Sequence, residues 1–337
     1  IIGTELITYS SKSGNTLSGL TRGASGTTAA IHSSGATVTD ASTYAGWGAA
    51  PSGDIITAPG LWALDNFGNT LIATIFSGET FTWSSDATNA TNTRAALASG
   101  APTASRDMLV STPDRHLVFF GTETTIGTKS TQDQMFIRFS SQEDITDYVP
   151  TATNSAGTQR LADGSRIMGS LRGRNAIYVW TDTALFLMRF VGAPFTFAFE
   201  QVGTNCGLIG KNAAVEVDGT VYWMSENGFF RYGGQLESLP CLVEDFVFDD
   251  LNTVTKQHVN AGLNNLFGEI NWFYVSSGSN TVNRVVTYNY FDSSNDRPIW
   301  TTGTLDRTAW ADSAIFGKPH ATQYDTTTNG TAGSSTY

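Results

Sequence analysis

Short apolar runs recur along this chain from about residue 58 onwards, separated by turns and polar residues. Six of these runs predict β-strands, and they begin at residues 71, 116, 177, 221, 270 and 319. The intervals between the starts are 45, 61, 44, 49 and 49 residues. Because propeller blades typically repeat every ~40–50 residues, all intervals except the second favour a β-propeller.

The residues around each run follow a common order. Turn-forming residues precede the first five runs, at 66–69, 113–115, 172–175, 218–219 and 267–269, and a second strand follows the first four, at 80–83, 135–139, 184–188 and 228–232. Each unit therefore predicts a small antiparallel sheet whose apolar face must be covered by a neighbour, as in a propeller. The alternative is an irregular β-sandwich in which the regular spacing is accidental.

Two segments carry helical patterns between the strands. In residues 141–148, Ser141 is followed three residues later by Asp144, which resembles a capping box and predicts one helical turn before Pro150. In residues 242–251, apolar side chains at 243, 246, 247 and 251 predict a short amphipathic helix between blades.

The first 50 residues differ from the rest of the chain. Their short alternating runs, broken by Gly and Asn, predict small hairpins, and the Gly-rich stretch at 44–48 predicts a linker. We expect residues 1–50 to form a small β module with its linker, and residues 51–337 to form the propeller-like domain. Because the chain starts without Met and stops in a Gly/Ser/Thr stretch, we expect both ends to be cut from a longer protein and the last blade to be incomplete.

Composition agrees with an all-β fold and limits the partners. Charged residues make up only 15% of the chain, whereas aromatic residues reach 12% and glycine occurs 34 times, a mixture that favours strands and tight turns. The net charge of −11 repels nucleic acid, so sequence-specific DNA binding is not expected, although DNA could pass transiently. No stretch approaches the ~18 consecutive apolar residues of a membrane span.

Motifs for catalysis or cofactor binding are absent from the sequence. The four histidines stand in separate contexts without zinc-ligand spacing, and there is no GxSxG motif of a serine hydrolase. Residues 203–212 resemble a phosphate-binding loop, but Asn205 and Asn212 replace a required glycine and a required hydroxyl residue, so we interpret them as a turn between blades. Adjacent acids at 143/144, 244/245 and 249/250 fit a solvated surface better than an acid/base pair. We expect no enzyme activity and no cofactor.

The two cysteines, Cys206 and Cys241, lie 35 residues apart without a metal-binding pattern. We predict reduced, buried thiols, with a disulfide or a metal site as the alternatives.

Charged residues are unevenly distributed. From Tyr232 to Thr255 there is no Lys or Arg. This acidic stretch contains Glu237, Glu244, Asp245, Asp249 and Asp250. A basic stretch contains Arg160, Arg166, Arg172 and Arg174 with only Asp163 among them. In a ring of identical subunits, such stretches could meet across a head-to-tail interface or line a channel. Two ordinary solvated surfaces are the alternative.

Several segments resemble the nozzle protein of short-tailed bacteriophages, also called tail tubular protein B. They are residues 110–121, 135–144 with 147–151, 203–207 and 217–225, and the resemblance extends over residues 45–337. Residues 1–45 instead resemble a small β module that recurs in assorted phage virion proteins. These segments carry no catalytic signature, so the resemblance concerns identity and not a site.

The resemblance implies a propeller-containing structural protein in the phage tail. Such a subunit would form a homo-oligomeric, hexameric ring below the tail adaptor protein, enclose the DNA exit channel and contact the tail fibres. An acidic channel wall would repel phosphates and let DNA slide past.

Two other functions remain open at this point. A receptor-binding or tail-fibre protein could recognise a cell-surface glycan by stacking exposed Trp and Tyr side chains on sugars. A propeller glycan hydrolase is the third hypothesis, although residues 83–88 lack the glycine and the following tryptophan of a sialidase-type Asp box.

Overall fold

The structure is a computed structural model that describes residues 2–3, 5–24, 27–38, 61–84, 95–112, 114–312 and 317–323. Within these ranges β-strands predominate, and the one α-helix is α1 (Glu244–Asp250). Five four-stranded sheets and a final two-stranded sheet follow one another from residue 62, and the strands of each sheet are antiparallel and pair in chain order. Consecutive up-and-down sheets of this kind are the blades of a β-propeller.

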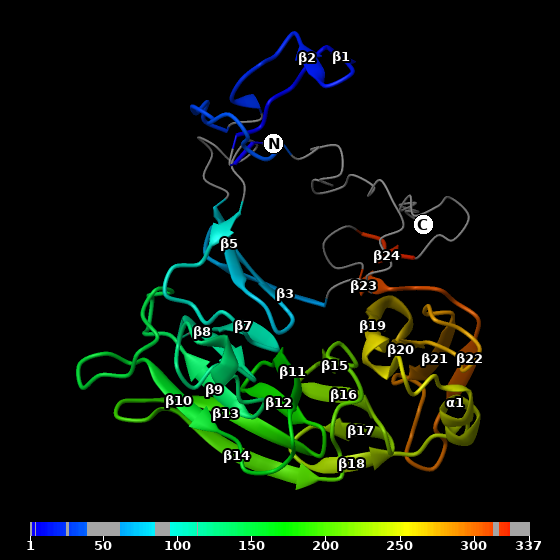
Figure 1. Ribbon diagram of the computed structural model, residues 1–337. Helices are drawn as coiled ribbons and strands as arrows, with labels where there is room; N and C mark the ends of the chain where they lie inside the picture. Colours follow the sequence, from blue (N-terminus) through cyan, green and yellow to red (C-terminus); the bar gives the residue numbers. More distant parts are fainter. Residues whose placement is uncertain are drawn as a thin grey trace.

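Each blade takes a separate stretch of chain (Figure 1). Blade 1 contains β3 (Trp62–Phe67), β4 (Thr70–Ile75), β5 (Thr80–Ser84) and β6 (Ala96–Leu97). Blade 2 contains β7 (Asp107–Ser111), β8 (His116–Phe120), β9 (Phe136–Phe139) and β10 (Gly157–Arg160). Blade 3 contains β11 (Ile167–Arg172), β12 (Ile177–Thr181), β13 (Ala184–Gly192) and β14 (Thr196–Thr204).

The remaining blades complete the described part of the disc. Blade 4 contains β15 (Ala214–Val217), β16 (Thr220–Ser225), β17 (Gly228–Tyr232) and β18 (Leu236–Leu239). Blade 5 contains β19 (Asn260–Asn264), β20 (Glu269–Tyr274), β21 (Arg284–Asn289) and β22 (Trp300–Gly303), and blade 6 contains β23 (Ala309–Ala311) and β24 (His320–Thr322). Short 3₁₀ helices lie in the loops between these strands, among them η3 (Lys129–Thr131), η4 (Lys256–His258) and η5 (Asn265–Phe267).

The first strand of each blade lies at the hub of the disc. Figure 1 shows β7, β11, β15 and β19 near the centre and β10, β14, β18 and β22 at the periphery. The first strands β3, β7 and β11 contact one another in this order, as do β15, β19 and β23. These hub strands run in the same direction, so their first residues gather on one face of the disc, here called the N-face, and their last residues on the other, the C-face.

The six apolar runs of the sequence are the second strands of the blades, β4, β8, β12, β16, β20 and β24. This confirms the predicted repeat and excludes the β-sandwich alternative. The following strands predicted at 80–83, 135–139, 184–188 and 228–232 are β5, β9, β13 and β17. Second strands are the most apolar because both of their faces are covered, one by each neighbouring blade.

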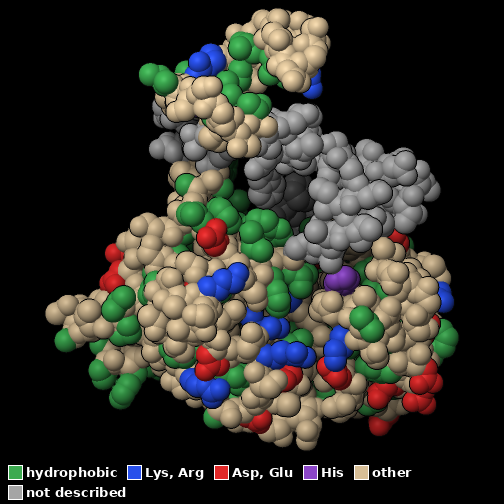
Figure 2. All heavy atoms as spheres, in the orientation of Figure 1, with side chains coloured by type: hydrophobic (Ala, Val, Ile, Leu, Met, Phe, Trp, Pro, Cys, Tyr) green, Lys and Arg blue, Asp and Glu red, His purple; other side chains and the backbone are tan. Residues whose placement is uncertain are grey.

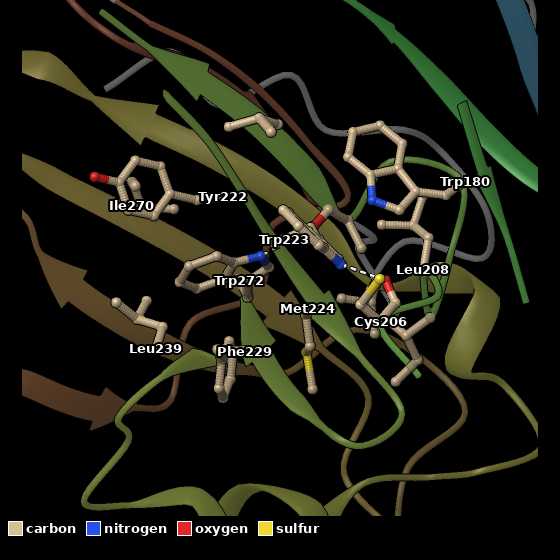
Figure 3. Close-up of a cluster of buried hydrophobic side chains, with 14 of the residues drawn as sticks. Trp180, Cys206, Leu208, Tyr222, Trp223, Met224, Phe229, Leu239, Ile270 and Trp272 are labelled. Carbon is tan, nitrogen blue, oxygen red and sulfur yellow. Dashed lines mark hydrogen bonds between the residues drawn. The ribbon is translucent and has the colours of Figure 1, made fainter. Parts of the chain in front are cut away.

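Tryptophans from successive second strands form the largest apolar core (Figure 3). Trp180, Trp223 and Trp272 stand on β12, β16 and β20 and are fully buried. The indole N–H of Trp223 donates to the carbonyl of Cys206 at 2.8 Å, and that of Trp272 donates to the carbonyl of Ala213 at 3.0 Å. Each of these indoles therefore fastens its blade to the segment that connects blade 3 to blade 4.

One of the two helix predictions is correct. The predicted helix at 242–251 is α1, and Glu244 and Asp245 in its first turn interact favourably with the helix dipole. The helical turn predicted at 141–148 is wrong, because this segment forms tight non-helical turns. Glu143 adopts a left-handed φ of 60°, and the Asp144 carboxylate accepts hydrogen bonds from the N–H and hydroxyl of Thr146, which stabilises a turn instead of a helix.

The described N-terminal residues contain the hairpin of β1 (Ser11–Ser13) and β2 (Thr16–Ser18). A buried carboxylate organises this region: Glu5 accepts hydrogen bonds from the Arg22 guanidinium, the N–H groups of Gly23 and Ala30, and the ring of His32. The bond from Arg22 in particular holds the pKa of Glu5 well below its ordinary value. The predicted linker at 44–48, the boundary at residue 50 and the expected truncation at the C-terminus lie outside the described residues, so the division into 1–50 and 51–337 stays a prediction.

Candidate functional site at the propeller hub

A first ion pair joins the three hub strands of blades 1 to 3. The guanidinium of Arg172 on β11 donates to both carboxylate oxygens of Asp65 on β3, at 3.0 Å each. It also donates to the carbonyl of Val110 on β7 at 3.2 Å, and the Val110 N–H donates to Asp65 at 2.7 Å. Nη2 of Arg172 makes both bonds to Asp65, while Nη1 makes the bond to Val110, so one guanidinium joins three strands that are far apart in sequence.

A second ion pair lies deeper in the hub. The Lys211 ammonium lies 2.9 Å from the carboxylate of Asp107, and the two side chains are only 8% and 5% exposed. Asp107 also accepts hydrogen bonds from the N–H of Ser170 at 2.8 Å and from its hydroxyl at 2.7 Å. Lys211 donates further to the carbonyl of Trp62 at 3.2 Å. Burying two charges is costly, but here both are paired and hydrogen-bonded, so removal of either partner would leave an uncompensated charge.

Two cavities open at the hub. The larger, of about 560 Å³, lies toward the C-face and is lined by Thr112, Arg172, Gly173, Arg174, Glu216, Asp218 and Gly219. The smaller, of about 280 Å³, is lined mainly by β11, β19 and β23 together with Lys211 and Asn212. Within the described ranges, no group of three or more His, Cys, Asp or Glu side chains could hold a metal ion.

The structure separates the four arginines that the sequence placed in one stretch. Arg172 and Arg174 are together at the C-face cavity, where Arg172 pairs with Asp65 and Glu216 accepts the backbone N–H of Arg174. Arg160 lies at the outer end of β10 and pairs with Asp133 at 2.7 Å. Arg166 is exposed just before β11. Partial burial of Arg106, and to a lesser degree the charge of Arg166, lower the pKa of the Arg106 guanidinium to about 10. The four side chains thus form no single basic patch.

The acidic residues remain closer together. Figure 2 shows Asp and Glu side chains gathered over the side of the disc that carries α1 in Figure 1. Glu237 pairs with Arg231, and Asp250 pairs with Arg284. Glu244, Asp245 and Asp249 on α1 form no ion pair with any other described residue. Burial, together with the charge of Asp245, raises the pKa of Glu244 above its ordinary value.

Sequence inspection missed a hydrogen-bonded chain of Asp114, His116 and Ser155. His116 Nδ1 lies 3.1 Å from the carboxylate of Asp114, and His116 Nε2 lies 3.2 Å from the Ser155 hydroxyl. This order of groups is that of a serine-hydrolase triad. However, the Ser155 oxygen already accepts the N–H of Gln142 at 2.8 Å, and the His116 ring is fully buried. The chain ties the β7–β8 turn to the loop before β10.

Aromatic rings enclose this histidine. Phe139, Phe190 and Phe197 pack around His116 with ring centroids 5.2–6.2 Å away. No local motif could have revealed the triad-like chain, because Ser155 lies 39 residues after His116. The spacing of Asp114 and His116, two residues apart at a strand start, was the only signal available.

Both cysteines are free thiols with raised pKa values. Cys206 is buried and Cys241 is half-buried, so the prediction of a buried thiol holds fully only for Cys206. Burial raises the pKa of Cys206 to about 11 and that of Cys241 to about 12, which keeps both thiols protonated at neutral pH.

Exposed tryptophan is scarce among the described residues. Trp180, Trp223 and Trp272 are in the core, and the most exposed tryptophan in the described ranges is Trp62, at 40%. The other large exposed aromatic side chains of these ranges include Tyr9, Phe195, Phe267 and Phe291. Among the residues that the structure describes, no helix has the length and apolar character needed to cross a membrane.

Comparisons with known proteins give no family for this chain. No family model matches it, and no curated protein matches its sequence. Among solved structures, it is similar to the dihydro-heme d1 dehydrogenase NirN, with 10% identity, a TM-score of 0.46, and coverage of 78% of this chain and 52% of NirN. It is also similar to Saccharomyces cerevisiae Sqt1, with 9% identity, a TM-score of 0.45, and coverage of 78% and 80%. An ancestral GH74 enzyme has 13% identity, a TM-score of 0.45, and coverage of 78% of this chain and 40% of the enzyme.

Proposed function

We propose that this chain is a structural subunit of a short-tailed bacteriophage virion, which forms the nozzle ring at the distal end of the tail. The ring, a hexamer by analogy with the family that the sequence resembles, would enclose the DNA exit channel and contact the tail adaptor and tail fibres. The starting point of the proposal is the resemblance of residues 110–121, 135–144, 203–207 and 217–225 to nozzle proteins. These segments belong to blades 2, 3 and 4 and to the connection between the last two.

The observation that best supports the proposal is the braced hub. The pairs Asp65–Arg172 and Asp107–Lys211 cross the centre of the propeller and join blades 1, 2 and 3 and the connection to blade 4. A subunit built in this way serves as a rigid wall element. A DNA channel would then lie between several copies and not through one propeller.

The surface charge is compatible with such a channel. The chain carries a net charge of −11, and α1 presents carboxylates without internal partners. Acidic walls repel phosphate groups, so DNA would slide without being held. In a head-to-tail ring, α1 could instead face basic residues such as Arg166 of the next copy.

The direct test is to locate the chain in the intact particle. A cryo-EM reconstruction of the tail should show the propeller in several copies around the tail axis, beyond the adaptor. A position at the periphery, in threefold fibres, would favour the receptor-binding alternative and contradict the nozzle. Hydrolysis of host polysaccharide by the purified chain would contradict a purely structural role.

A further inference from the structure

The smaller of the two hub cavities lies where the hub strands separate. These strands contact one another in two groups, β3 with β7 and β11, and β15 with β19 and β23. The cavity, of about 280 Å³, is lined by β11 of the first group and by all three strands of the second, together with Lys211 and Asn212. Figure 1 shows β11, β15 and β19 around the centre of the disc. Because ligand sites typically measure ~300–1,000 Å³, a cavity of this size suits a small molecule.

The ammonium of Lys211 keeps one N–H for a group in this cavity. Two of its three N–H groups are used, one by the Asp107 carboxylate at 2.9 Å and one by the carbonyl of Trp62 at 3.2 Å. Among the described residues that line the cavity, Lys211 is the one ionisable side chain, and Asp107 already balances its charge. The site therefore favours a neutral ligand with an acceptor oxygen, because the Asp107 carboxylate would repel a second anion.

Asn260, at the start of β19, adds a buried acceptor to the lining. Its amide N–H donates to the carbonyl of Arg307 at 3.1 Å, which orients the side chain. Its Oδ1 atom is buried, and no described residue donates a hydrogen bond to it. A buried carbonyl oxygen without a donor is unfavourable. A ligand that brings an O–H group to this wall would remove the deficit.

Trp310 on β23 forms an aromatic wall of the cavity. Its indole N–H already donates to the carbonyl of Leu263 at 2.8 Å, so the ring alone is left for a ligand. The ring also packs on Phe273, with centroids 5.8 Å apart, and lies against Gly262, where a Cβ atom would come within 2.7 Å of it. The indole is thus fixed in place before any ligand binds, which lowers the entropy cost of binding.

We propose that this cavity binds a small, neutral, hydroxyl-rich molecule of the size of a monosaccharide or a shorter polyol. A hydroxyl group both donates and accepts, so one such ligand can donate to Asn260, accept from Lys211 and place its C–H groups against Trp310. Ordered water could serve the two polar groups, but it gains nothing from the indole. The inference concerns a single copy of the chain and does not depend on the proposed ring.

The test measures binding of D-glucose, N-acetyl-D-glucosamine and glycerol to the full chain by isothermal titration calorimetry, with inorganic phosphate as the anion probe. Ala309→Leu fills the cavity from β23. Ala311→Leu is the matched control, because both alanines are exposed on β23 but only Ala309 lines the cavity.

We expect at least one of the three neutral probes to bind at one site per chain, with unchanged affinity in A311L and no detectable binding in A309L. Asn260→Ala should weaken this binding about tenfold, as expected for the loss of one hydrogen bond. Because a ligand that binds only the folded state stabilises it, the bound probe should also raise Tm of the wild type and A311L, but not of A309L.

Several results would overturn the inference. One is that none of the three neutral probes binds with a dissociation constant below ~10 mM, and another is that A309L binds as tightly as the wild type. Binding of phosphate alone would show that the site takes an anion. A crystal structure grown with the tightest-binding probe that shows only ordered water in the cavity would identify water as the occupant. None of these results bears on the nozzle, which is tested by the position of the chain in the particle.

Discussion

The buried pair of Lys211 and Asp107 offers a direct test of how the hub is held together. Replacing Lys211 with methionine removes the ammonium but keeps most of the side-chain volume. The Asp107 carboxylate then stays buried without its cation, between β7, β11 and the segment that connects blade 3 to blade 4. Leaving one partner of a buried ion pair alone costs ~3–5 kcal/mol.

The remaining hydrogen bonds place the expected loss at the lower end of this range. Asp107 would still accept hydrogen bonds from the N–H and hydroxyl of Ser170. We therefore expect Lys211→Met to lower the free energy of unfolding by about 3 kcal/mol and Tm by about 6–9 °C for a domain of this size. Lys256→Met is the matched control, because Lys256 pairs with Glu226 at the surface, and it should change stability by less than ~1 kcal/mol.

A double-mutant cycle separates the ion pair from lost packing. Combining Lys211→Met with Asp107→Asn removes the uncompensated charge, so the double variant should regain at least half of the stability lost in Lys211→Met. Urea unfolding and differential scanning calorimetry at neutral pH measure all four proteins. If Lys211→Met is as stable as wild type, or if the two changes are simply additive, then the hub pair does not brace the blades as described.

Three other predictions concern the blades and the Asp114–His116–Ser155 chain. Trp223→Phe should destabilise the fold by roughly 1–3 kcal/mol more than Trp180→Phe in thermal melts, because the Trp223 N–H donates to the Cys206 carbonyl whereas the Trp180 N–H has no partner. Equal losses of stability would contradict a role of the Trp223 hydrogen bond in holding the blade. Burial acts to raise the pKa of Asp114, but hydrogen bonds from His116 and Ser111 lower it overall. Its contribution to stability is therefore present above the unfolded-state pKa of ~3.9 and is lost as pH falls through the lower folded value, so Asp114→Asn should flatten the acid limb of a stability–pH profile measured by urea unfolding. A fluorophosphonate probe should not label Ser155, and labelling that disappears in Ser155→Ala would reveal a nucleophile instead of a structural hydroxyl.

The sequence predicts the blades well because their second strands are apolar on both faces. The runs at β8, β12, β16 and β20 are recognisable without any tertiary information, and their spacing gives the order of the sheets. The hub strands are harder to recognise, because polar residues such as Asp65, Asp107 and Arg172 interrupt their apolar positions. In the folded disc, these polar residues satisfy one another across the hub, which no local pattern can indicate.

The candidate site depends on contacts between distant residues. Asp65 and Arg172 are 107 residues apart, so their pairing follows only from the ring arrangement of the first strands. For the same reason, the sequence grouped Arg160 with Arg172, although blade geometry places one at the outer edge and the other at the hub. The error at 141–148 has a different origin, because the Asp144 side chain can stabilise a turn as readily as a helix start.

A cryo-EM map of the virion tail, at a resolution that distinguishes propeller blades, tests most directly whether this chain forms the nozzle. We expect a ring of copies of this chain on the tail axis, each with a braced hub, and a DNA channel bounded by several subunits. DNA density that runs through the centre of a single propeller, or a tail axis without this chain, would contradict it.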